Sequence, residues 1–305
     1  MAYVTVFTPT YNRKHTLKRA FESLQRQTFL DFIWLIVDDG STDDTNELVE
    51  EFKKEAVFPI EYYYKENGGK HTAYNFSHEF VKTEYRITLD SDDELPDNTL
   101  EQIKKAWESI PQEDYDRFWC LRGRCIVAET GEVMSDEWPQ GINTLKGKKQ
   151  HKQVLKALKG ENPLCQKSNI FCKYLYPIYP GFKGTLPPGI IYETVNSDYD
   201  QYCVNDIFTI YHTDTPNSLV KTIPPQRYYY MSQYCINNMF EQVTYNKRIF
   251  KSLLSIYPNA KKSGIKFTEM MRDSNAWYKK LLILTLMPFS VIVWTFKEIH
   301  DKHFK

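Results

Sequence analysis

The first 130 residues alternate short apolar runs with longer stretches in which apolar residues recur every three or four positions. Short β-branched and aromatic runs are typical of buried strands, and the longer pattern is typical of amphipathic helices. Strands alternating with helices of this length predict right-handed crossovers and a parallel sheet. The predicted strands cover residues 3–8, 32–37, 60–64, 85–89 and 118–128, and the predicted helices cover residues 15–27, 41–52, 70–81 and 96–110.

Two local signals fix expected boundaries in this region. Pro9 is expected to end the first strand, because proline has no N–H for a strand ladder. Ser41 and Asp44 form an S-x-x-D signal that predicts a capped helix after the second strand.

The pattern beyond residue 130 is less regular. Residues 135–190 are rich in Pro, Gly and Lys, with one predicted helix near residues 149–158. A predicted strand follows at residues 207–211, and then a mostly helical region at residues 226–275. Residues 281–296 form a run of sixteen residues without a charge.

Composition narrows the classes of protein that fit. The chain has 305 residues, of which 42% are hydrophobic, as expected of a folded globular protein. Its 39 Lys and Arg residues balance 39 Asp and Glu residues, which argues against a protein that coats nucleic acid. The six cysteines form no CxxC pair and the N-terminus shows no signal-peptide pattern. We therefore expect reduced thiols and a cytoplasmic location.

Polar sequences follow three of the predicted strands, and ligands of parallel sheets bind beyond the carboxyl ends of the strands. The sharpest of these is Asp90-Ser91-Asp92. Carboxylates at positions i and i+2 of an extended segment point the same way and favour a divalent cation that keeps open positions for phosphate oxygens. The alternative is that Asp92, Asp93 and Glu94 only favour the start of the next helix through its dipole.

Asp38-Asp39 follows the second predicted strand. A carboxylate here can accept an N–H from a nucleobase such as uracil. The alternative is that it caps the following helix, which the Ser41 and Asp44 signal favours.

Taken together, four segments resemble the family 2 glycosyltransferases, which are inverting enzymes with a GT-A fold, and among them the bacterial capsular and exopolysaccharide transferases. The four motifs occur in the family's order over about 95 residues. They are Thr8-Pro9-Thr10-Tyr11-Asn12-Arg13, Val37-Asp38-Asp39-Gly40-Ser41-Thr42-Asp43, Glu66-Asn67-Gly68-Gly69-Lys70-His71-Thr72-Ala73-Tyr74-Asn75 and Leu89-Asp90-Ser91-Asp92-Asp93.

The resemblance implies an α/β fold of GT-A type, with a Rossmann-like, mostly parallel sheet flanked by helices. Beyond residue 220, where the resemblance ends, the pattern along the chain predicts a mainly helical C-terminal extension. Residues 1–220 would form the glycosyltransferase domain, with a nucleotide-sugar half at 1–130 and an acceptor half at 131–220. Residues 221–275 would form the helical extension and residues 276–305 an apolar tail.

The resemblance also implies roles for particular residues. The loop after the first strand would cradle the nucleoside, Asp39 would accept the base N–H, Asp90 would hold the ribose, and Asp92 would bind Mn²⁺ or Mg²⁺. The implied nucleotide-binding residues are Thr8, Pro9, Tyr11, Asp39, Asn67, Lys70, Asp90 and Ser91. As alternatives, Tyr11 is a packing aromatic and Lys70 a solvated cation at a helix start.

Inverting transfer needs a general base for the acceptor hydroxyl. The segment Leu186–Glu193 resembles the acceptor side of bacterial polysaccharide transferases, but Pro188 occupies the position that is often acidic in relatives. Glu193 and Asp198 are therefore the candidate catalytic bases, and surface carboxylates on a helix are the alternative. His212 is a candidate second metal ligand, and a structural or acceptor-contacting histidine is the alternative.

The charge-free run at 281–296 is flanked by Lys279, Lys280 and Lys297. As a helix it would rise about 24 Å, less than the hydrocarbon core of about 30 Å, and Pro288 lies in its middle. A helix in the plane of the inner-membrane surface fits this pattern, and packing on the protein's own core or on a second copy in a homodimer is the alternative.

We therefore predict a peripheral enzyme at the cytoplasmic face of the membrane. It would transfer a sugar from a nucleotide-sugar donor, UDP-linked, to a glycan or lipid-linked glycan acceptor by metal-assisted single displacement. A catalytically silent nucleotide-sugar-binding subunit and a nucleotidyltransferase are the alternatives.

Overall fold

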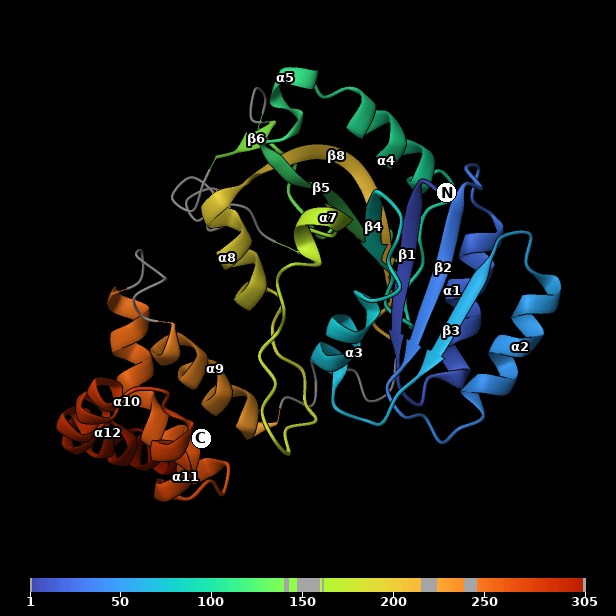
Figure 1. The fold of residues 1–305 in the computed structure, drawn as a ribbon. Coiled ribbons are helices and arrows are strands. Elements are labelled where there is room, and N and C mark those ends of the chain that lie inside the picture. The colour runs from blue at the N-terminus through green and yellow to red at the C-terminus, as the bar shows by residue number, and fades with distance from the viewer. Residues whose placement is uncertain are drawn as a thin grey trace. The chain divides into compact units, whose positions relative to one another are not determined.

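The fold was obtained as a computed structural model that describes residues 2–139, 143–146, 160, 162–214, 224–238 and 246–303 (Figure 1). The chain divides into two compact units. The first comprises Met1–Tyr176 and Pro187–Ser218, and the second comprises Pro177–Leu186 and Leu219–Lys305. The predicted boundary between residues 220 and 221 and the predicted helix near residues 149–158 lie outside the described residues.

An eight-stranded mixed sheet forms the centre of the first unit, in the order β3-β2-β1-β4-β7-β5-β8-β6. Strands β1 to β4 are parallel to one another, and β7 runs antiparallel to both of its neighbours, β4 and β5. The strands are β1 (Val4–Thr10), β2 (Phe32–Asp38), β3 (Ile60–Tyr64), β4 (Tyr85–Thr88), β5 (Phe118–Val127), β6 (Thr144–Leu145), β7 (Leu164–Lys167) and β8 (Asp200–Tyr211).

Helices cover both faces of this sheet. Alternate strand residues face opposite sides, so Val6 and Phe118 join the core beneath α1, α2 and α4, whereas Phe7 and Trp119 contact side chains of α3, α7 and α8. The helices of this unit are α1 (Lys14–Gln25), α2 (Thr45–Glu55), α3 (Lys70–Ser77), α4 (Thr99–Glu108), α5 (Gln112–Tyr115), α7 (Ser168–Phe171) and α8 (Gly189–Asp198).

Strand β1 continues through Pro9 to Thr10, so the prediction that Pro9 ends the strand is wrong. The pairing of β1 with β4 stops at Phe7, whereas its pairing with β2 continues to Thr10. The missing N–H of Pro9 therefore falls where β1 has lost its neighbour on one side, which is where a strand tolerates proline.

The predicted cap of α2 is also wrong, although the helix itself is present. The helix begins at Thr45, and Asp44 takes a left-handed conformation without a side-chain capping bond. Ser41 instead accepts a hydrogen bond from the backbone N–H of Asn12 at 2.8 Å. The motif thus connects two loops rather than capping a helix.

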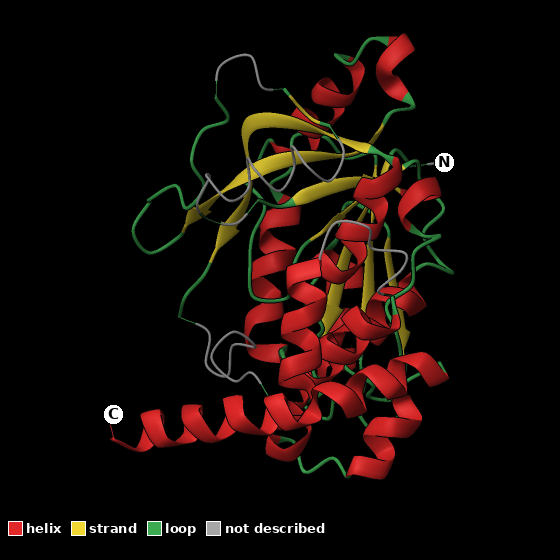
Figure 2. Cartoon of the chain, turned by 90° about the vertical axis from the view of Figure 1, so that its left-hand side faces the viewer, coloured by secondary structure: helices red, strands yellow, loops and turns green. Residues whose placement is uncertain are grey.

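The second unit is helical. Its helices are α9 (Pro225–Asn237), α10 (Asn246–Lys262), α11 (Phe267–Asp273) and α12 (Trp277–His303). They share a small core that includes Tyr229, Ile256, Met270 and Ile283. Figure 2 shows α12 as one continuous helix that leads to the C-terminus, with Pro288 inside it. Among the described residues, no helix combines the length and the apolar character needed to cross a bilayer.

Candidate functional site

The carboxyl ends of β1, β2 and β3 reach the same edge of the sheet (Figure 1), and hydrogen bonds join the loops that follow them. Asn12 follows β1 with a φ of 50°, and its side-chain oxygen accepts a hydrogen bond from the Thr42 N–H at 2.7 Å. With the bond from the Asn12 N–H to Ser41, this fixes the first loop against the second.

Asp39 lies at the centre of these loops, with only 3% of its surface exposed. Its carboxylate accepts hydrogen bonds from the N–H groups of Gly68 and Gly69 at 3.0 and 2.7 Å. The Lys65 ammonium donates to the same carboxylate at 2.6 Å and to the Thr72 hydroxyl at 2.9 Å. A buried charge is tolerated when it is paired and hydrogen-bonded in this way.

A glycine allows the second and third loops to approach each other. Gly40 has a φ of 90°, and a Cβ at this position would lie 2.7 Å from the backbone nitrogen of Asn67. The Asn67 amide donates to the Asp39 carbonyl at 2.8 Å. The close contact therefore depends on the absence of a side chain at position 40.

The first residue of α3 is joined to the loop after β4. The Lys70 ammonium donates to both oxygens of the Asp90 carboxylate at 2.7 Å. Burial opposes the charge on Lys70, but the attraction of Asp90 outweighs it and raises the pKa of the lysine. Lys70 is thus a paired cation rather than a freely solvated one.

The segment from Asp90 to Asp93, which we call the acidic turn, concentrates negative charge. Burial and then repulsion from Asp90 raise the pKa of Asp92, while Arg13 at 3.9 Å opposes this shift. Asp93 is 6% exposed and accepts a hydrogen bond from the His212 N–H at 3.0 Å. Burial and then Asp90 raise the pKa of Asp93 to about 8. Crowded carboxylates of this kind are relieved by a cation.

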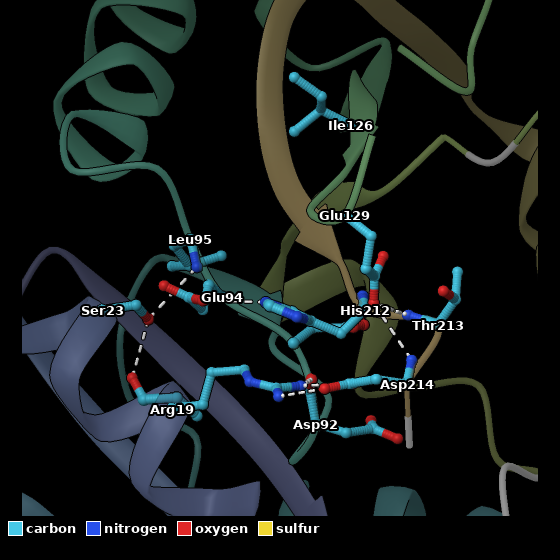
Figure 3. Close-up of polar contacts among 12 residues, drawn as sticks. Arg19, Ser23, Asp92, Glu94, Leu95, Ile126, Glu129, His212, Thr213 and Asp214 are labelled. Carbon is cyan, nitrogen blue, oxygen red and sulfur yellow. Dashed lines mark hydrogen bonds and ion pairs between the residues drawn. The ribbon is translucent and has the colours of Figure 1, made fainter. Parts of the chain in front are cut away.

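Contacts from α1 and from the end of β8 hold the acidic turn in place (Figure 3). The Arg19 guanidinium donates to the Asp92 carbonyl at 3.0 Å and pairs with both oxygens of Asp214 at 3.2 and 2.9 Å. The His212 Nε2 atom lies 2.8 Å from the Glu94 carboxylate. The residue that follows β8 is therefore brought to the acidic turn.

A second group of potential metal ligands lies beside the turn. Within the described residues, ligand atoms of Glu129, His212 and Asp214 lie within 4.8 Å of one another. Each of them has a protein partner: Arg19 on Asp214, Glu94 on His212, and the backbone N–H of Thr213 on Glu129. Figure 3 shows these contacts around His212.

The structure places the remaining predicted nucleotide residues on the same edge of the sheet. Thr8 is buried, and its hydroxyl accepts a hydrogen bond from the Trp34 indole at 2.9 Å. Pro9 and Ser91 are also buried, whereas Tyr11 is 48% exposed. Of these four, Tyr11 presents the most surface to a ligand.

Asp198, one of the two predicted bases, lies away from the acidic turn. It is the last residue of α8, next to the start of β8, and its carboxylate accepts a hydrogen bond from the Tyr174 hydroxyl at 3.1 Å. His212 follows the other end of β8, about 35 Å away along the twelve-residue strand. Glu193 lies half-buried, midway along α8. Both residues therefore lie on helix α8, which is also what the alternative of surface carboxylates on a helix predicts.

Sequence reasoning missed two side chains that build this site, Arg19 and Lys65, and it gave no site role to two others that it named, Arg13 and Glu94. Lys65 directly follows β3, so it could have been predicted from the rule that ligands bind beyond the ends of the strands. Arg19 lies inside α1, and its contacts join residues 73 and 195 positions apart, which no local pattern could reveal.

Comparisons with known proteins point to one family. A family model described as Glycosyl transferase family 2 matches residues 5–166, just over half of the chain. A Campylobacter jejuni protein named GalNAc(5)-diNAcBac-PP-undecaprenol beta-1,3-glucosyltransferase is 27% identical over 144 residues, which cover 47% of this chain and 44% of that protein. An uncharacterized glycosyltransferase of Mycoplasma pneumoniae is 32% identical over 124 residues, covering 38% and 42%. The chain thus spans less than half the length of these curated relatives.

Solved structures show the same fold at low identity. S. aureus TarS 1–349 in complex with UDP-GlcNAc has a TM-score of 0.60 and 13% identity, covering 95% of this chain and 80% of that one. A mannosyltransferase from Pyrobaculum calidifontis in complex with GDP-Man and Mn²⁺ has a TM-score of 0.52 and 14% identity, covering 95% and 81%. These similarities confirm the GT-A type of fold.

Proposed function

Because this chain belongs to glycosyl transferase family 2, we propose that it moves a sugar from a nucleotide-sugar donor to a hydroxyl group of a glycan or lipid-linked glycan. The observation that carries the proposal is the arrangement at the edge of the sheet. Three hydrogen-bonded loops and the acidic turn meet beyond the ends of β1 to β4, where ligands of such sheets bind.

A UDP-linked donor suits the polar groups of the three loops. Asp39 and Lys65 offer an acceptor and a donor side by side, which matches the N–H and adjacent carbonyl of the uracil edge. The Lys65 side chain is long and flexible. Its ammonium can therefore move from the Asp39 carboxylate to the base carbonyl, while Asp39 accepts the base N–H. Tyr11 would contact the base, Asn67 the base and ribose, and Asp90 the ribose. The complex of TarS with UDP-GlcNAc supports this choice of nucleotide.

A divalent metal suits the acidic turn. Its hard carboxylate oxygens are the ligand type that Mg²⁺ and Mn²⁺ prefer. Burial and then repulsion from Asp90 raise the pKa of Asp92, and a bound cation would offset both effects. Asp92 would hold the ion, with His212 as a second ligand. When bound, the ion would stabilise the charge that develops on the departing nucleoside diphosphate. The Mn²⁺ complex of the Pyrobaculum mannosyltransferase supports this assignment.

Of the two predicted bases, Glu193 is the one we retain. It would take the proton of the acceptor hydroxyl as the oxygen attacks the anomeric carbon from the face opposite the nucleotide. Asp198 is exposed whereas Glu193 is half-buried, which weighs against Asp198. Replacing Glu193 with Gln is therefore expected to lower kcat with little change in donor affinity.

The acceptor would lie at the membrane. The Campylobacter relative is named for a substrate linked to PP-undecaprenol, which supports a lipid-linked glycan as the acceptor of this chain. We propose that the enzyme works peripherally at the cytoplasmic face of the membrane, where it could reach such a substrate.

The decisive assay follows the nucleotide product. With a panel of UDP-sugars, Mn²⁺ and a glycan-lipid extract, we expect UDP to be released only when acceptor is present, and Asp92→Asn to abolish the release. In a parallel assay with UTP and a sugar 1-phosphate, formation of a UDP-sugar with release of pyrophosphate would identify a nucleotidyltransferase instead. Binding of donor without any turnover would identify a silent binding subunit.

A further inference from the structure

The outward face of α12 is apolar and exposed. Large side chains are exposed along it at helical spacing: Trp277 at 75%, Leu281 at 53%, Leu284 at 46%, Phe289 at 60% and Ile292 at 51%. Three to five residues separate successive members, so they follow one side of the helix over four turns. We call these five residues the α12 face.

The opposite side of the same helix is anchored in the protein. Ile283 is 1% exposed in the core of the helical unit, and the Ser290 hydroxyl donates to the Leu254 carbonyl of α10 at 2.6 Å. Lys279 is 4% exposed, and its ammonium donates to the Asn275 side chain at 2.7 Å. The α12 face is therefore the outer side of a packed helix rather than part of a detached one.

The charge of the chain is divided between its two units. The helical unit contains fifteen Lys and Arg residues and five Asp and Glu residues, an excess of ten positive charges. The sheet unit contains 24 Lys and Arg residues and 34 Asp and Glu residues, an excess of ten negative charges. The exposed cations of the helical unit include Lys251, Lys261, Lys262 and Lys266. A net charge of zero thus conceals a strongly basic unit.

We propose that the α12 face docks the enzyme on an anionic lipid surface, with the apolar side chains entering the interface and the basic excess of the helical unit attracting the headgroups. An exposed apolar helix side on a basic unit is the combination that binds such a surface. The charge favours lipid over a second copy of the chain, because two units that each carry ten excess positive charges repel each other.

The purpose of this docking rests on the proposed function, because a membrane-bound enzyme could reach a lipid-linked acceptor. The binding itself requires no residue of the active site. An Asp92→Asn variant is therefore expected to bind vesicles as the wild type does. Loss of transfer with retained vesicle binding in Asp92→Asn is thus the expected result. A wild-type protein that binds vesicles but transfers no sugar would contradict the enzymatic assignment alone.

The test is sedimentation of the full chain with vesicles. Wild-type protein should bind vesicles of phosphatidylcholine mixed with phosphatidylglycerol, bind pure phosphatidylcholine less, and bind less as salt is raised. The double variant Leu281→Glu, Leu284→Glu should lower the partition coefficient by about tenfold or more, because each leucine loses its transfer into the interface. Val57→Glu, at an apolar residue 66% exposed on the sheet unit, should change it less than about twofold.

Two outcomes would overturn the proposal. One is that the double variant, shown by its melting temperature to be folded, binds the anionic vesicles as well as the wild type does. The other is that the wild type does not bind vesicles but self-associates in sedimentation velocity, while the double variant stays monomeric. The α12 face would then be a contact between copies.

Discussion

At the scale of single residues, the site depends on charges that are buried in pairs. Asp39 and Lys65 have side chains that are 4% and 17% exposed and lie 2.6 Å apart. Two backbone N–H groups complete the surroundings of the carboxylate. Breaking such a pair costs more than the pair contributes, because one charge is left buried without its partner.

Replacing Lys65 with Met should therefore lower the free energy of unfolding by about 2–4 kcal/mol and weaken UDP binding. Denaturant unfolding and calorimetric titration would measure the two effects. Lys53→Met is the matched control, because Lys53 pairs with Glu50 on the surface. It should cost less than about 0.5 kcal/mol. Equal effects of the two substitutions would show that Lys65 has no special role.

His78 gives the fold a dependence on pH. Burial and then the nearby charge of Arg86 lower the pKa of His78 to about 3, so the ring is neutral in the folded protein. The unfolded chain gains a proton below about pH 6.5. The stabilisation is therefore complete above about pH 6.5 and is lost as the pH falls from there towards 3.

We expect the free energy of unfolding to fall by up to about 1.4 kcal/mol per pH unit across this window, and His78→Leu to flatten the slope. Unfolding curves at a series of pH values provide the measurement. The exposed His15 supplies the control, since His15→Gln removes an imidazole that the fold does not bury. An unchanged slope in His78→Leu would contradict the account.

At the scale of elements, the site is made by loops that contact one another beyond the strand ends. Gly40 and Gly131 both have positive φ angles, but only Gly40 has a backbone atom within 3 Å of the position of a Cβ. Replacing Gly40 with Ala should cost about 3 kcal/mol or more and impair donor binding, whereas Gly131→Ala should cost about 1 kcal/mol from strain alone. Similar melting temperatures for the two variants would exclude the close approach.

The strands and helices of the first 130 residues could be predicted because their hydrophobic pattern is strong. Strand β7 escaped prediction because its four residues, Leu164–Lys167, end in Gln and Lys and so do not form an apolar run. The predicted strand end at Pro9 and the predicted helix cap at Ser41 were wrong because contacts with a neighbouring strand and a neighbouring loop decided the structure there. Local propensity decides such positions only where no neighbouring strand or loop competes.

The candidate site could be predicted only in part, for a similar reason. The sequence located the acidic turn and Asp39, since strand ends can be read from pattern. The partners of these residues could not be found in this way. Arg19 and Asp214 are 195 positions apart in the chain, and only the fold brings them together.

At the scale of the whole molecule, zero net charge is a sum over two unlike units. The acidic excess belongs to the sheet unit with the acidic turn, and the basic excess belongs to the helical unit with the α12 face. Under the proposed function, a bound cation would help the acidic sheet unit to take up a nucleoside diphosphate. A basic unit can approach an anionic membrane without one.

The most direct test of this account is thermal unfolding of the full chain with UDP, with and without Mn²⁺. At a UDP concentration of about 100 times Kd, binding adds about 2.7 kcal/mol, which corresponds to a rise in Tm of about 5–10 °C. We expect this rise only when UDP and Mn²⁺ are both present, and we expect Asp92→Asn to lose it while Asp97→Asn, at an exposed carboxylate paired with Arg26, keeps it. An equal rise without the metal, or in Asp92→Asn, would contradict the account.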